Sequence, residues 1–160
     1  RDDLTTRQGN AGPTIETPDA QCPGKHVFEY AIVPHPGDWQ AAYQQAHWFA
    51  TPLRAVAVRP KGGPLPPSFG FISAEPDTVV VSAIRPAEER DGIIVRVYSL
   101  SPQVVEAVIR VGLPVEKAWQ VNLDEERIEE VEVSEGVSIP FAIGPAQILS
   151  FKLALHPKPL

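Results

Sequence analysis

Acidic residues are the first place to look for catalytic chemistry in this chain. Asp2 and Asp3 form the obvious adjacent pair. A retaining attack on a glycosidic bond needs two carboxyl groups about 5 to 5.5 Å apart, one on each side of the sugar. Neighbouring residues of an extended segment point to opposite sides, so this pair does not meet that requirement. We therefore expect no catalytic residue in this chain.

The four histidines are the other candidates for chemistry, because imidazole is a common metal ligand. They occur at positions 26, 35, 47 and 156, without the short spacings that bring two imidazoles to one ion. We expect no metal site within this chain. His35 stands between two prolines and is expected to bond nearby backbone. His47 is expected at the surface or at a domain interface.

Three tryptophans, Trp39, Trp48 and Trp119, could form an aromatic platform for a sugar. The apolar faces of sugar rings stack on indoles in the way other apolar groups do. Core packing is the simpler interpretation for two of them, because Trp39 lies on the apolar stripe of a predicted helix and Trp119 alternates with Val121 in a predicted strand. Carbohydrate binding remains an alternative, with Trp48 as its test position.

Composition limits the classes of partner. The formal net charge is −6, which argues against nucleic acid or an anionic membrane surface as a partner. The sequence contains no run of about 20 apolar residues, so no transmembrane helix is expected. A single cysteine cannot form an internal disulfide, which favours a reducing, cytoplasmic location. The chain has no methionine, so we expect a domain of a longer protein.

The N-terminal part predicts an arm, a strand and a helix. Residues 1–25 are rich in glycine and proline and have few large apolar side chains, which predicts an extended arm or loop. Residues 26–33 alternate with period two, which predicts a strand. Asp38 is expected to be the N-cap of a short helix that packs its apolar stripe on the sheet. Residues 54–59 predict another strand.

The remainder predicts an antiparallel β-sandwich. The chain holds 18 prolines, about twice the usual share, which suits many short strands rather than a helical bundle. We assign residues 26–160 to this sandwich domain, with a sub-boundary at the loop 60–68. Short β-branched runs separated by turn residues predict strands at 69–74, 78–84, 93–99, 104–111, 115–122, 127–133, 137–143 and 147–155.

Two details of these strands can be predicted. Pro140 cannot donate a ladder hydrogen bond, so its strand is expected at a sheet edge. Residues 124–135 contain seven of the 20 acidic residues. We interpret them as the solvated face and turn of a hairpin, where charge also discourages edge-to-edge pairing.

Several motifs carry a family resemblance. They are the run from Arg7 to Pro13, the run from Ala20 to Trp39, Thr51 to Val56, Ser73 to Asp77 and Val80 to Ile84. Together they resemble the C-terminal β-rich region of family 38 glycoside hydrolases, the retaining zinc α-mannosidases. The resemblance extends along nearly the whole chain. It implies that the zinc, the nucleophilic aspartate and the acid/base carboxylate belong to an N-terminal catalytic region that is not in this chain.

The same resemblance implies three substrate-binding residues, Arg7, Asp3 and Asn10. They lie in a segment similar to an acidic, arginine- and glycine-containing stretch whose arginine faces the substrate cleft in eukaryotic relatives. An arginine can donate several hydrogen bonds to sugar hydroxyls or hold a carboxylate in place. The alternative is that Arg7 pairs with Asp2 or Asp3 in a structural turn.

The expected function is that of a non-catalytic C-terminal β-sandwich domain of a bacterial-type α-mannosidase. It would buttress the catalytic barrel and lend a loop to the sugar-binding cleft. Three partners are expected: the catalytic domain, a mannose-containing glycan, and a second copy of the chain through the parent enzyme. The zinc would be held by the catalytic domain. Alone, the chain is expected to be inactive and to need no cofactor. The alternatives are an autonomous carbohydrate-binding module and an oligomerisation module that uses the helix from Tyr43 to Trp48.

Overall fold

The computed structural model describes residues 15–16, 18, 22–59, 62–63 and 65–156. The chain divides into two units, residues 1–34 and residues 35–160, which are treated separately here. The arm boundary after residue 25 and the sub-boundary at 60–68 stay predictions. Among the described residues, no helix has the length and apolar character needed to cross a membrane.

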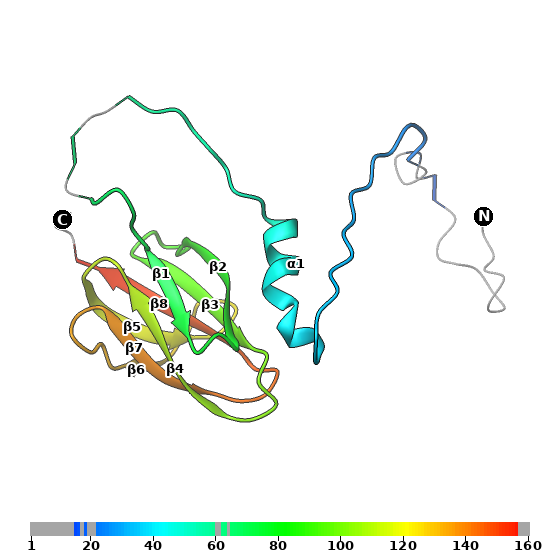
Figure 1. The fold of residues 1–160 in the computed structure, drawn as a ribbon. Coiled ribbons are helices and arrows are strands. Elements are labelled where there is room, and N and C mark those ends of the chain that lie inside the picture. Colours follow the sequence, from blue (N-terminus) through cyan, green and yellow to red (C-terminus); the bar gives the residue numbers. More distant parts are fainter. Residues whose placement is uncertain (1–14, 17, 19–21, 60–61, 64, 157–160) are drawn as a thin grey trace. The chain divides into compact units, whose positions relative to one another are not determined.

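The second unit contains a β-sandwich of two antiparallel sheets (Figure 1). One sheet has the order β1-β4-β7 and the other has the order β2-β3-β8-β5-β6. This confirms the predicted fold class, mainly β with one short helix. The strands are β1 (Ile72–Glu75), β2 (Val79–Pro86), β3 (Ile93–Ser99), β4 (Val105–Val111), β5 (Val115–Val121), β6 (Arg127–Val131), β7 (Ser138–Ile143) and β8 (Ile148–Leu155).

The main core lies between the two sheets and follows the alternation of the strands. In β8, Leu149, Phe151 and Leu153 are buried, as the period-two pattern predicts. The ring of Phe151 lies 4.8 Å from that of Phe141, which comes from the opposite sheet. The fully buried side chains from both sheets include Val95, Val97, Ile109, Ile139 and Ile143. The sandwich therefore has a core of its own.

A second, smaller cluster covers part of the outer face of the five-stranded sheet. It contains the buried residues Ala87, Ile94 and Val121, with Trp119 packed against them. The guanidinium of Arg127 lies 4.0 Å from the centre of the Trp119 ring. The expectation of core packing for Trp119 is met only in part, because its half-buried side chain packs against this smaller cluster and not in the main core.

The two predicted details of the strands agree with the structure. Pro140 is in β7, an edge strand of the three-stranded sheet. The acidic stretch forms the turn and second strand of the β5–β6 hairpin, in which the Asn122 carboxamide accepts from the N–H groups of Asp124 and Glu126, both at 2.9 Å. Glu125 is the exception among the acidic residues, since its side chain is only 8% exposed.

The predicted helix forms in two parts, a 3-10 turn η2 (Trp39–Ala41) and the helix α1 (Tyr43–Ala50). Asp38 is the N-cap of η2, where its carboxylate accepts from the Trp39 N–H at 2.7 Å, whereas the N-cap of α1 is Ala42, which makes no side-chain cap. No residue of either part is buried, so the expectation of a core role for Trp39 is wrong. The contacts of α1 with the sandwich are made by polar and aromatic side chains and form the candidate site below.

The strands predicted at 26–33 and 54–59 do not form. Both segments are exposed and have no ladder partner among the described residues. The physical reason is that a strand is stable only when a neighbour accepts its hydrogen bonds, and local alternation alone does not supply one. The alternation indicates that these segments can pair as strands, but the described residues do not provide a partner strand.

Candidate functional site

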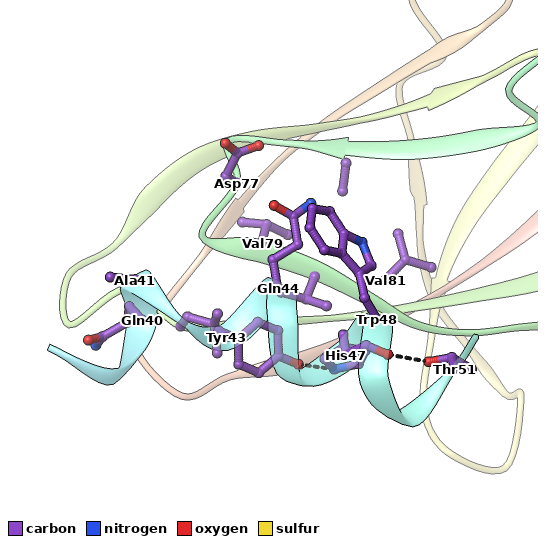
Figure 2. Close-up of a pocket in the computed structure, with 13 residues that line it drawn as sticks. Gln40, Ala41, Tyr43, Gln44, His47, Trp48, Thr51, Asp77, Val79 and Val81 are labelled. Carbon is purple, nitrogen blue, oxygen red and sulfur yellow. Dashed lines mark hydrogen bonds between the residues drawn. The ribbon is translucent and has the colours of Figure 1, made fainter. Parts of the chain in front are cut away.

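A groove of about 500 Å³ lies between α1 and the β1–β2 side of the sandwich (Figure 2). Its helix side carries Gln44, His47 and Trp48, and its sheet side carries Asp77 and three consecutive valines of β2. The other lining residues are Gln40, Ala41, Tyr43, Thr51, Ala74 and Leu100. The groove is therefore lined by aromatic, amide, carboxylate and aliphatic groups together.

The helical repeat positions the helix side of the groove. Residues four apart lie on one face of a helix, so Gln44 and Trp48 form one pair and Tyr43 and His47 form another. Figure 2 shows the Gln44 and Trp48 side chains extending toward the strands, on the same side as Asp77. Trp48 is 63% exposed, which leaves much of its indole face available to a ligand.

Tyr43, His47 and Tyr98 link the helix to strand β3. The Tyr43 hydroxyl and the His47 Nε2 are hydrogen-bonded, and the Tyr98 hydroxyl lies 3.5 Å from the same nitrogen. The Tyr43 and Tyr98 rings meet edge to face, with 6.2 Å between their centres. Partial burial raises the pKa of Tyr98 above its ordinary value. These contacts orient the His47 ring beside the groove, where it can offer a hydrogen bond.

The sheet side of the groove is held by the turn between β1 and β2. The Val79 N–H donates to the Pro76 carbonyl at 2.8 Å, which closes the turn that carries Asp77. Val79 is buried in the main core, so the floor of the groove rests on packed structure. Asp77 is exposed at the rim, where its carboxylate can accept hydrogen bonds from a ligand hydroxyl.

An ionic cluster occupies a different place, on the outer face of β8. The Lys152 ammonium lies 2.8 Å from the Asp91 carboxylate and 3.2 Å from that of Glu89. The Lys152 side chain is 4% exposed, so its charge depends on these two partners. The hydrogen bond between Asp91 and Lys152 raises the pKa of Lys152 and lowers the pKa of Asp91.

Glu125 joins this cluster to the β5–β6 turn. Its carboxylate lies 2.6 Å from the Arg85 guanidinium and accepts from the Glu88 N–H at 2.9 Å. The Glu88 hydrogen bond, with the Arg85 charge, holds the pKa of Glu125 below its ordinary value against the opposing effect of burial. The loop from Glu88 to Asp91 is thereby tied down at two points. We interpret the cluster as a structural clamp over the outer face of the sheet.

The sequence-predicted site residues fall in different places. Arg7, Asp3 and Asn10 lie outside the described residues. The ring of His35 donates to the Pro36 carbonyl at 3.3 Å, which confirms the predicted turn role. His47 is exposed, as expected, and lies on the groove. Among the described residues, no group of three or more histidine, cysteine, aspartate or glutamate side chains could hold a metal ion.

Sequence reasoning missed two features of these sites. Tyr98 reads as an ordinary strand residue, and only tertiary packing brings it to His47. Lys152 carries a detectable signal, because it is a charged residue at an outward position between Phe151 and Leu153 in an apolar strand. A lysine at such a position is expected to need an acidic partner, but the sequence does not say which acid supplies it.

Comparisons with known proteins find a family model and relatives that resemble this chain. Residues 78–151 match the family model described as the glycosyl hydrolases family 38 C-terminal beta sandwich domain. The chain is 30% identical over 152 residues to human Alpha-mannosidase 2C1, an alignment that covers 90% of this chain and 14% of that protein. It is 29% identical over 152 residues to the Mus musculus protein of the same name, with the same coverage. The predicted resemblance is confirmed, and the chain spans about one seventh of the length of both relatives.

Proposed function

We propose that this glycosyl hydrolase family 38 C-terminal β-sandwich domain is a non-catalytic part of a longer α-mannosidase-like polypeptide. Its role is to stabilise the catalytic domain and to contribute the arm that carries Arg7, Asp3 and Asn10 to the sugar-binding cleft. The support is the match of residues 78–151 to the C-terminal sandwich and the small share that the chain forms of the relatives named alpha-mannosidase.

The observation that carries this proposal is the uneven distribution of exposed apolar residues. The sandwich buries its own core, whereas the segments before it present Phe28, Tyr30 and Ile32 and also Leu53, Val56 and Val58 to solvent. Exposed apolar groups in such a row mark each of these two segments as an interaction site. A catalytic domain in the same polypeptide would cover both segments.

The proposal also covers the position of the catalytic groups and the zinc, the substrate, and the cellular location of the parent enzyme. The zinc and the two catalytic carboxyl groups belong to the catalytic domain, and the substrate is a mannose-containing glycan. A cytoplasmic location of the parent enzyme is part of the proposal, and the single cysteine of this chain, which cannot form a disulfide within it, fits a reducing compartment. Assembly into homo-oligomers would take place through the parent enzyme.

The experiment that tests the proposal is complementation in trans. This chain is mixed with the separately expressed N-terminal part of its parent, and mannoside hydrolysis is assayed with zinc. We expect higher activity or thermal stability in the mixture than in the N-terminal part alone. Arg7→Ala tests the arm, and Lys117→Ala, at an exposed basic residue of strand β5 in the sandwich, serves as the control. Equal activity and stability with and without this chain would refute the supporting role.

A second candidate function, carbohydrate binding by the domain itself, is favoured by the groove beside α1. Trp48 offers an exposed indole face, while Asp77 and Gln44 offer acceptors and a donor for sugar hydroxyls. Lectin-like recognition of a hexose requires this combination of a stacking surface and directed hydrogen bonds.

Titration calorimetry with α-mannosides tests this second function. Saturable binding that Trp48→Ala abolishes would support it. Trp39→Ala is the matched control, because Trp39 is 52% exposed and does not line the groove. No heat at millimolar sugar would leave the supporting role as the function of the domain. A concentration-dependent dimer that loss of Trp48 disrupts would identify the helix as an oligomerisation surface.

A further inference from the structure

Residues 26–33 have a sequence typical of a buried strand, but in the structure they form no strand and their side chains are exposed. The segment reads His-Val-Phe-Glu-Tyr-Ala-Ile-Val, a composition typical of strands. Four of its large apolar side chains, Val27, Phe28, Tyr30 and Ile32, are 79 to 86% exposed, and Val33 is 38% exposed. A soluble protein rarely leaves a row of large apolar groups in water without a partner.

The backbone of this segment is also unpaired. Across the part of the chain that the structure describes, residues 27–33 make no backbone hydrogen bond. Unpaired N–H and C=O groups in an extended segment can serve as a template for another strand. Among the described residues, the His26 ring is hydrogen-bonded to the Cys22 carbonyl at 2.7 Å and stacks on Phe28, and both interactions are local.

Both faces of the segment are suited to burial. Phe28, Tyr30 and Ile32 form one face, and Val27, Ala31 and Val33 form most of the other. A strand with water on one side would alternate apolar with polar residues, whereas Glu29 is the one charged residue between Val27 and Val33. The segment therefore fits a sheet that is covered on both faces.

The edges of the described sandwich are poor partners for this strand. Edge strand β7 contains Pro140, and edge strand β6 carries Glu129 and Glu130. Edge strand β2 has an irregularity between Val81 and Ala83, and β1 is only four residues long. Prolines, charges, bulges and short strands all discourage edge pairing. A second copy of this sandwich would offer the same protected edges.

We propose that His26–Val33 adds as a strand to an open edge of a β-sheet in the preceding part of the same polypeptide. This proposal rests on the proposed function and names how the domain is attached. An alignment that covers 90% of a 160-residue chain includes residues 26–33 wherever it starts, so the segment lies within the region shared with a relative about seven times longer. Covalent linkage gives the strand a high effective concentration at such an edge.

Hydrogen–deuterium exchange on the longer parent polypeptide tests the proposal directly. We expect the amides of residues 27–33 to exchange at least about 100-fold more slowly there than in this chain alone, because ladder hydrogen bonds protect them. The measurement is made at several protein concentrations. Unprotected amides in both proteins would overturn the proposal, and so would protection that appears only as either protein dimerises.

A pair of matched substitutions in the parent polypeptide tests the packing of the segment. Ile32→Ser and Leu123→Ser remove aliphatic side chains that are 85% and 70% exposed in this structure. We expect Ile32→Ser to accelerate exchange of residues 27–33 by about tenfold or more, while Leu123→Ser leaves it unchanged. An equal effect of the two substitutions, or no effect of Ile32→Ser, would contradict burial of the segment.

The proposal and the proposed function can fail separately. If residues 27–33 are protected but the catalytic part is equally stable and active without this domain, the strand addition stands and the supporting role fails. If the domain stabilises the catalytic part while residues 27–33 stay unprotected, the supporting role stands and the strand addition fails.

Discussion

Truncation of Leu153 tests whether the sandwich is stabilised by its own core. Leu153 is fully buried in β8, whereas Ile148, in the same strand, is 60% exposed. Leu153→Ala removes three buried carbons, which at roughly 0.8 kcal/mol each is about 2.4 kcal/mol of transfer free energy. The cavity left in a packed core raises the expected loss of unfolding free energy to about 3 to 5 kcal/mol. Ile148→Ala should cost about 1 kcal/mol, because more than half of the side chain is already in water.

Equilibrium urea unfolding of the 160-residue chain measures both losses. Trp119 is the reporter, because it is the one tryptophan of the sequence that lies in a strand of the sandwich. With a urea dependence of about 1 to 3 kcal/mol per molar, Leu153→Ala should lower the midpoint by about 1 to 5 M. Losses for Leu153→Ala and Ile148→Ala that agree within about 0.5 kcal/mol would refute the assignment of faces in β8.

Three further predictions concern a close packing contact, an ion pair and a helix cap. A Cβ at Gly112 would lie 2.4 Å from the Gly70 carbonyl oxygen and 2.7 Å from the Phe69 ring, so Gly112→Ala should lower the unfolding free energy by about 1 to 3 kcal/mol in urea unfolding. The pKa of Asp91 is lowered from its ordinary 3.8, so the contribution of Asp91 to stability is present above pH 3.8 and is lost as the pH falls through the folded-state pKa. The pKa of Lys152 is raised from its ordinary 10.5, so the contribution of Lys152 is present below pH 10.5 and is lost as the pH rises through the folded-state pKa. Asp91→Asn should flatten the acid side of a plot of urea midpoint against pH, and an unchanged acid side would exclude the pair as its cause. Asp38→Ala should destabilise the first turn of the helix by about 1 kcal/mol, seen as faster amide exchange in that turn, with no change in the sandwich strands.

Much of the fold could be predicted because strand faces are a local property. The alternation of Leu149, Phe151 and Leu153 specifies which side of β8 meets the core, and Pro140 specifies an edge strand. The segment 26–33 shows the limit of the same logic. Its alternation is as clear, but pairing needs a second strand, which the described residues do not provide. Trp39 was assigned to the core from helical spacing and is exposed, because a helical stripe is buried only where a surface covers it.

The candidate site could be predicted only in part, because its residues come from distant elements. The sequence offers Trp48 only as an alternative sugar-stacking residue and predicts His47 only at a surface or a domain interface, because their meeting with Asp77 depends on how α1 lies against β1 and β2. The contact of His47 with Tyr98 spans 51 positions of sequence. Spacing along the chain carries no information about such a contact.

The amino-acid sequence by itself determined the β-sandwich class, the boundaries of the eight sandwich strands to within a few residues, the Asp38 cap of the first turn and the family resemblance, because each depends on local pattern or on motifs. Tertiary structure alone decided the strand order of the two sheets, the burial of Lys152 beneath its acidic partners and the groove lined by Trp48 and Asp77. The physical reason is that strand order and side-chain contacts are set by the total free energy of packing the sheets together. That quantity depends on surfaces that are far apart in the chain.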